Sequence, residues 1–62
     1  MNEVSIITTN RIEQLEIMRS NTEDIILCYS NMRHPNKQKF IEIYERNLQS
    51  IEEELEKLKN KL

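Results

Sequence analysis

The sequence contains no glycine, no tryptophan and a single proline, Pro35, in 62 residues. A protein built from β-strands needs turn residues such as glycine and proline between its strands, so this shortage argues against a β fold. Glu, Lys, Gln, Leu and Met, which favour helices, are plentiful after residue 10. The composition therefore predicts an all-α protein.

Cysteine and histidine are equally scarce, because Cys28 and His34 are the only examples of each. One cysteine forms no internal disulfide, and two soft ligands do not complete a structural zinc site. The sequence also has no glycine-rich phosphate loop, no Glu–His metal spacing and no nucleophile triad. We therefore assign no catalytic, cofactor-binding or metal-binding residue and predict that the protein is not an enzyme.

Long apolar runs and an excess of positive charge are also missing. No segment approaches the roughly 20 apolar residues of a membrane span, and residues 1–9 lack the basic and apolar segments of a signal peptide. A lone cysteine suits a reducing compartment, so we expect a cytoplasmic protein without membrane contact. The net charge of −2 argues against a general nucleic-acid-binding protein.

The amino-terminal segment differs from the rest of the chain. Val4 to Thr9 is rich in β-branched residues, which are weak helix formers, so residues 1–9 are predicted to be a flexible tail. Asn10 and Glu13 have the spacing of a helix capping box. We therefore place the start of a helical hairpin, residues 10–62, at this point.

The first predicted helix covers residues 10–33. Its apolar residues alternate by three and four, as one face of a helix requires, with Thr22 filling the one gap; they are Leu15, Met18, Ile25, Tyr29 and Met32. Ile12 and Ile26 widen this face. A second capping-box pattern at Ser20–Glu23 offers a break, but we predict one helix because the apolar phase continues through Thr22.

The second predicted helix covers residues 36–62, after a turn at residues 33–36. Pro35 disfavours helix at His34 and suits a helix start, so the turn is short and the helices antiparallel. The apolar positions of this helix form an a/d heptad stripe without a gap; they are Ile41, Tyr44, Leu48, Ile51, Leu55, Leu58 and Leu62.

The predicted architecture is a two-helix antiparallel hairpin that dimerises into a four-helix bundle. A chain this short buries little apolar surface alone, and without a disulfide or a metal it gains stability by association. An alternative is a parallel coiled coil of the second helix, in which Glu54 faces Lys59 of the partner. The predicted self-association residues are Leu15, Met18, Ile25, Tyr29, Leu48, Ile51, Leu55 and Leu58.

A second group of residues near the turn is a candidate surface for a different protein. Aromatic and apolar side chains surrounded by basic charge are typical of binding anchors; here the candidates are Arg33, Lys37, Lys39, Phe40, Ile43 and Tyr44. The alternative is that the apolar members simply cap the dimer core.

These observations predict a small protein–protein interaction module, a regulator, adaptor or inhibitor that binds another, unidentified protein. The alternative function is a DNA-associated regulator that contacts phosphates through the basic turn. A phosphorelay-type hairpin ranks last, because His34 lies in the predicted turn whereas such phosphoryl acceptors project from the middle of a helix.

Overall fold

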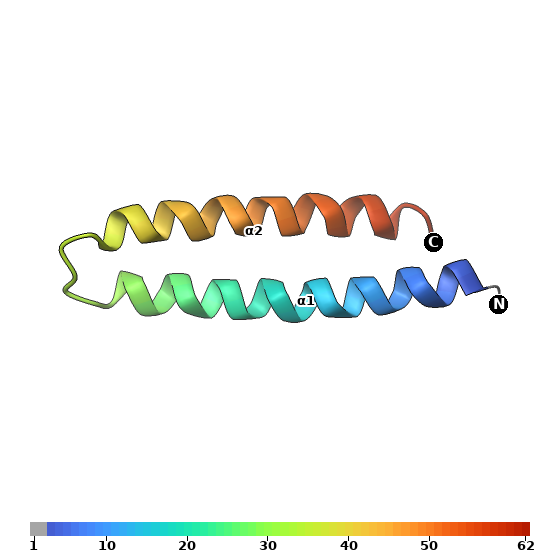
Figure 1. Ribbon diagram of the computed structural model, residues 1–62, viewed down its shortest axis with the longest axis horizontal. Helices are drawn as coiled ribbons and strands as arrows, with labels where there is room; N and C mark the ends of the chain where they lie inside the picture. The colour runs from blue at the N-terminus through green and yellow to red at the C-terminus, as the bar shows by residue number, and fades with distance from the viewer. Residues whose placement is uncertain (1–2) are drawn as a thin grey trace.

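The computed structural model describes residues 3–62, with side chains from residue 5 onward. It contains two α-helices, α1 (Glu3–Ser30) and α2 (Lys37–Lys59), joined by residues 31–36. The helices lie side by side and antiparallel along a molecule 50 Å long, so the start of α1 and the end of α2 lie together (Figure 1). The predicted all-α hairpin is confirmed, and α2 packs against α1 of its own chain.

α1 begins at Glu3, whereas the predicted helix began at residue 10. Residues 3–9, assigned to the tail, are helical, because Thr8 is buried four residues before Ile12 and extends the contact with α2. The hydroxyl of Thr9 donates to the Ser5 carbonyl at 2.8 Å, a bond compatible with a helix interior. The weak helix propensity of β-branched residues costs only about 0.5 kcal/mol each, which this burial offsets.

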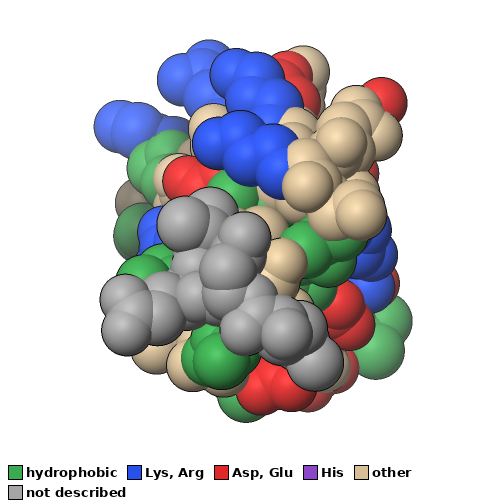
Figure 2. All heavy atoms as spheres, turned by 90° about the vertical axis from the view of Figure 1, so that its right-hand side faces the viewer, with side chains coloured by type: hydrophobic (Ala, Val, Ile, Leu, Met, Phe, Trp, Pro, Cys, Tyr) green, Lys and Arg blue, Asp and Glu red, His purple; other side chains and the backbone are tan. Residues whose placement is uncertain are grey.

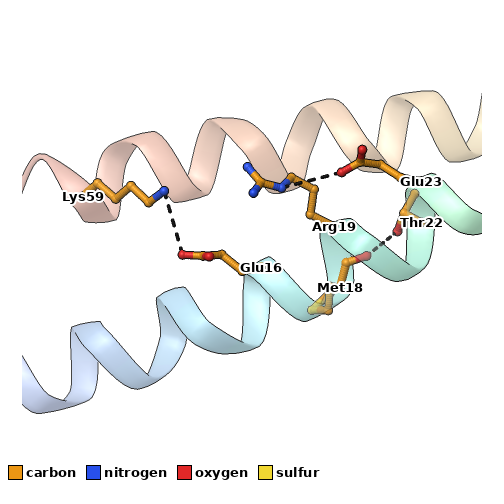
Figure 3. A network of polar contacts seen from close by, with 6 residues as sticks. All are labelled: Glu16, Met18, Arg19, Thr22, Glu23 and Lys59. Atoms are coloured by element: carbon orange, nitrogen blue, oxygen red, sulfur yellow. Dashed lines mark hydrogen bonds and ion pairs between the residues drawn. The ribbon is translucent and has the colours of Figure 1, made fainter.

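α1 is continuous across the second capping-box pattern, as predicted. The side chain of Thr22 is buried, and its hydroxyl donates back to the Met18 carbonyl at 2.8 Å (Figure 3). A threonine that bonds the preceding turn in this way satisfies its hydroxyl without ending the helix. Ser20 therefore lies inside the helix and does not cap a new one.

The stripe of α1 that faces α2 shares Leu15, Thr22 and Tyr29 with the predicted stripe and differs from it elsewhere. It alternates by three and four through buried or half-buried residues, namely Thr8, Ile12, Leu15, Arg19, Thr22, Ile26 and Tyr29. The predicted members Met18, Ile25 and Met32 are instead 44%, 36% and 42% exposed. α1 carries two overlapping stripes with the same spacing, and contact with α2 selects the one that includes Thr8 and Ile12.

The apolar stripe of α2 is confirmed except at its end. Ile41, Ile51 and Leu55 are buried, and Tyr44, Leu48 and Leu58 are half-buried. The helix ends at Lys59, three residues before the predicted end, and Leu62 is 66% exposed. Leu62 therefore lies outside the helical segment that packs against α1.

The apolar core lies in the half of the hairpin that holds the chain ends. It consists of Ile12, Leu15, Ile51 and Leu55, with Leu58 packed against them. Leu15 is the most completely buried residue, with 2% of its surface exposed. Within residues 3–62, neither helix combines the length and the apolar character that a membrane crossing requires.

Candidate interaction surface

An aromatic cluster closes the hairpin at its turn. The ring of Tyr29 on α1 stacks against Phe40 and Tyr44 on α2, with centroid distances of 5.2 Å and 6.0 Å. His34 meets the ring of Phe40 edge-on at 5.7 Å. Such aromatic pairs contribute beyond their buried area, so this cluster, together with the buried Ile41, holds the two helices together at the turn end.

His34 also shapes the connection between the helices. Its Nδ1 accepts a hydrogen bond from the Asn36 backbone N–H at 3.1 Å, and its backbone carbonyl accepts one from the Lys37 N–H at 3.1 Å. Asn36 precedes the first residue of α2, and its own side chain makes no capping bond there. The histidine side chain therefore occupies part of the capping role at the start of α2.

The six partner-binding candidates fall into two groups. Phe40 and Tyr44 are half-buried in the aromatic cluster, and Lys37 is half-buried beside the turn. The remaining three, Arg33, Lys39 and Ile43, are exposed at the same end of the hairpin. The turn end thus presents two basic side chains and one apolar side chain to the solvent, while the aromatic rings serve the fold.

The self-association candidates also divide. Leu15, Ile51 and Leu55 are buried between the two helices of one chain, and Tyr29, Leu48 and Leu58 are half-buried there. Met18 and Ile25 lie outside this contact and are exposed. Six of the eight candidates are therefore already engaged within the hairpin, and two remain available to a second molecule.

Two ion pairs between the helices mark the two broad faces of the hairpin. Arg11 Nε lies 2.9 Å from Glu54 Oε2 on one face. Lys59 Nζ lies 3.9 Å from Glu16 Oε1 on the other, which Figure 3 shows together with the Arg19–Glu23 pair of α1 at 3.7 Å. Residues seven apart lie on the same side of a helix, so each pair identifies the residues that share its face.

The face marked by Arg11 and Glu54 is uncharged over most of its length. From Gln14 to the turn, every residue on it is apolar or carries a neutral polar group, and we call it the uncharged face. Its members are Gln14, Met18, Asn21, Ile25 and Cys28 of α1, Met32 of the connection, and Phe40, Ile43, Asn47 and Ser50 of α2. All of them are exposed except Phe40, which is half-buried. This face was not predicted from the sequence, although the spacing of seven residues that relates its members is visible there.

The face marked by Glu16 and Lys59 is acidic. Glu23 follows Glu16 by seven residues on α1, and Glu52 and Glu45 precede Lys59 by seven and fourteen on α2. We call these four glutamates, Glu16, Glu23, Glu45 and Glu52, the acidic face. The two broad sides of the hairpin thus differ in charge, although the chain as a whole carries only −2.

Exposed apolar side chains outnumber buried ones. Among the described residues, five hydrophobic side chains are buried and nine large ones are exposed. Five of those nine lie on the side of the uncharged face, namely Ile7, Met18, Ile25, Met32 and Ile43. At the opposite end of the molecule from the turn, Figure 2 shows Lys and Arg side chains gathered where α2 ends.

Residues 3–62 enclose no pocket, and within them no three His, Cys, Asp or Glu side chains lie close enough to hold a metal ion. Cys28 is a free, exposed thiol. Comparison with protein-family models, with curated proteins and with solved structures finds no match to this chain.

Proposed function

We propose that this chain is a small protein–protein interaction module that forms a homodimer and regulates another protein by occupying part of its surface. The observation that carries the proposal is the excess of exposed over buried apolar side chains, nine against five. Soluble monomers rarely expose apolar side chains in contiguous patches, and where such patches occur they are usually binding surfaces. Two helices alone cannot cover these residues, so other chains do.

The homodimer is supported by the size of the chain. A protein of this length without a disulfide or metal has a small margin of stability, which association increases. Four of the five buried apolar side chains of the described residues form one cluster in the half that holds the chain ends, and Ile41 is buried nearer the turn. A second copy supplies apolar contact to the other half.

Recognition of the regulated protein is assigned to the turn end. Arg33 and Lys39 are exposed there, and two basic side chains beside apolar surface favour a partner with an acidic patch. Arg46 provides a matched control, because it follows Lys39 by seven residues on the same side of α2 and is also exposed.

The test is affinity capture from the source cell with the tagged chain, followed by mass spectrometry, for wild type, Lys39→Glu and Arg46→Glu. We expect Lys39→Glu to lose the captured protein and Arg46→Glu to retain it, with both variants as helical as wild type by circular dichroism. Equal capture by all three proteins would remove the turn end from the binding site.

DNA contact through the same basic turn is the alternative function. It rests on the exposure of Arg33 and Lys39 at one end of the hairpin. α2 becomes acidic after Glu42, so any duplex would touch only that end. Binding to DNA would weaken steeply as salt rises, because counterion release dominates such contacts, whereas a protein contact with an apolar component would be less sensitive.

A further inference from the structure

We propose that the homodimer forms through the uncharged face, as a parallel pair of hairpins with both turns at the same end. The proposal rests on the dimer of the proposed function and adds the face and the orientation. The occupant of the uncharged face is thus a second copy of this chain, and the product is a four-helix bundle in which α1 of each copy lies over α2 of the other.

Charge distribution selects the face. Two copies that met through the acidic face by the same rotation would set Glu16 over Lys59 of the second copy but Glu23 over Glu52, and apposed like charges are destabilising. The uncharged face brings no charge against itself from Gln14 to the turn. It is therefore the broad side on which two identical chains can approach without repulsion.

The dimensions also suit a dimer. The hairpin measures 50 by 14 by 10 Å, and the broad side that contains both helices is the 50 by 14 Å one (Figure 1). That side projects roughly 700 Å², close to the roughly 800 Å² that each partner contributes to a standard stable interface. A single segment of extended peptide or one short helix would leave half of it uncovered.

The spacing of the residues matches what a bundle helix needs. A helix that contacts two neighbours carries two apolar stripes, each alternating by three and four. α1 has the stripe that faces α2 and a second, exposed one, in which Met18, Ile25 and Cys28 are apolar and the remaining positions, Gln14 and Asn21, are uncharged. The second stripe has no partner within the chain, and a second copy provides one.

The remaining charges on this side select the orientation. Arg11 and Glu54 lie level with each other across the hairpin because they form an ion pair. A two-fold rotation about the long axis places Arg11 over Glu54 of the second copy, an attractive contact. Ile25 follows Arg11 by fourteen residues and Phe40 precedes Glu54 by fourteen, so Ile25 and Phe40 also lie level. The rotation therefore places apolar residues over apolar residues at the turn end. The antiparallel arrangement would instead set the Ile25 region against the Arg11 region.

The first test replaces residues of the uncharged face with glutamate and measures the mass in solution by analytical ultracentrifugation. We expect Ile25→Glu and Met18→Glu to raise the dimer dissociation constant about 100-fold or more, because each buries an unpaired carboxylate in the contact. Leu27→Glu is the matched control, since Leu27 is 62% exposed and lies outside the uncharged face. It should leave the dimer unchanged, and circular dichroism should show all three variants equally helical.

The second test measures the orientation. Nitroxide labels at Gln38→Cys, in a Cys28→Ser background, lie at the turn end away from the uncharged face. The parallel bundle predicts a label-to-label distance of about 30 Å and the antiparallel one about 45 Å, from helix spacing and rise.

The outcomes separate the inference from the proposed function. A wild-type dimer that Ile25→Glu and Met18→Glu leave intact overturns the uncharged face as the contact but leaves the dimer standing. A distance near 45 Å overturns the parallel orientation. A wild-type monomer at tens of micromolar overturns the inference and the homodimer together, while capture of another protein would still support an interaction module.

Discussion

α1 and α2 pack against each other but differ in how much of their apolar surface that contact uses. On α2 the apolar residues form one stripe, and Ile43 is the only large apolar side chain of this helix that is exposed. On α1 six large apolar side chains are exposed, namely Ile6, Ile7, Ile17, Met18, Ile25 and Leu27. One neighbouring helix thus covers most of the apolar surface of α2, but it does not cover that of α1. A helix whose apolar residues point to several sides has the composition of one with several neighbours.

The largest effect is expected when one leucine is removed from the buried side of α1 and, for comparison, one from its exposed side. Leu15→Ala deletes a side chain that is 2% exposed and is expected to cost about 3 kcal/mol of unfolding free energy, because it leaves a cavity in a small core. Leu27→Ala deletes one that is 62% exposed and should change the stability by less than about 0.5 kcal/mol.

Thermal and urea unfolding, monitored by circular dichroism at fixed protein concentration, would measure both variants. A large loss of stability in Leu27→Ala together with a loss of the dimer would show that Leu27 belongs to an interface. Similar small effects in both variants would contradict the core assigned to the end of the hairpin that holds the chain ends.

A smaller effect is expected at the turn, where aromatic stacking replaces the apolar core. Phe40→Ala removes the contacts of this ring with Tyr29 and His34 and should cost about 2 kcal/mol, since the side chain is half-buried and its aromatic pairs are lost. Phe40→Leu retains the apolar volume without the stacking and should cost about 1 kcal/mol.

Urea unfolding of Phe40→Ala, Phe40→Leu and Arg46→Ala at one protein concentration would test this order. Arg46→Ala, at an exposed position of the same helix outside the uncharged face, serves as the control for local changes in α2. If Phe40→Ala were as stable as wild type, the aromatic cluster would not hold the helices together and Phe40 would return to the partner-binding candidates.

The smallest effect is expected from a substitution that makes the stripe of α1 facing α2 more apolar. Arg19 occupies a position in the stripe facing α2 but is half-buried and pairs with Glu23 on the acidic side. Replacing it with leucine should raise the unfolding free energy by about 1 kcal/mol, because apolar burial outweighs a surface ion pair. Arg46→Leu, at an exposed site on α2, should have no such effect. A destabilised Arg19→Leu would show that the position needs its charge.

Most of α2 was predictable because its apolar residues lie on one side of the helix only. A gap-free heptad stripe on a helix with a charged remainder leaves only one side to bury, and Ile41, Ile51 and Leu55 are buried accordingly. The hairpin followed from Pro35 and the short turn. The end of α2 was less predictable, since Leu62 fits the spacing but follows the last residue of the helix, Lys59, and is exposed.

α1 was predicted as a helix, but its start was not, and its contact stripe was predicted only in part. Leu15, Thr22 and Tyr29 were predicted members, whereas Thr8 and Arg19 were not. The start of α1 depends on Thr8, a residue without a helix-start or helix-core signature, which becomes buried only because α2 lies beside it. The roles of Phe40 and Tyr44 were equally hidden, because sequence spacing places them on the turn side of α2 but does not show that Tyr29 stacks between them.

The sequence by itself determined the all-α class, the hairpin and the contact stripe of α2, because helix propensity, a single proline and an unbroken heptad each depend on local residues. Two overlapping stripes on α1 share Leu15, Thr22 and Tyr29. Only the packed structure shows which of the two is completed by buried residues. Both stripes have the same spacing, so no local rule separates them. Only the contact with α2 chooses, by covering Ile12 and Leu15 and leaving Met18 and Ile25 in the solvent.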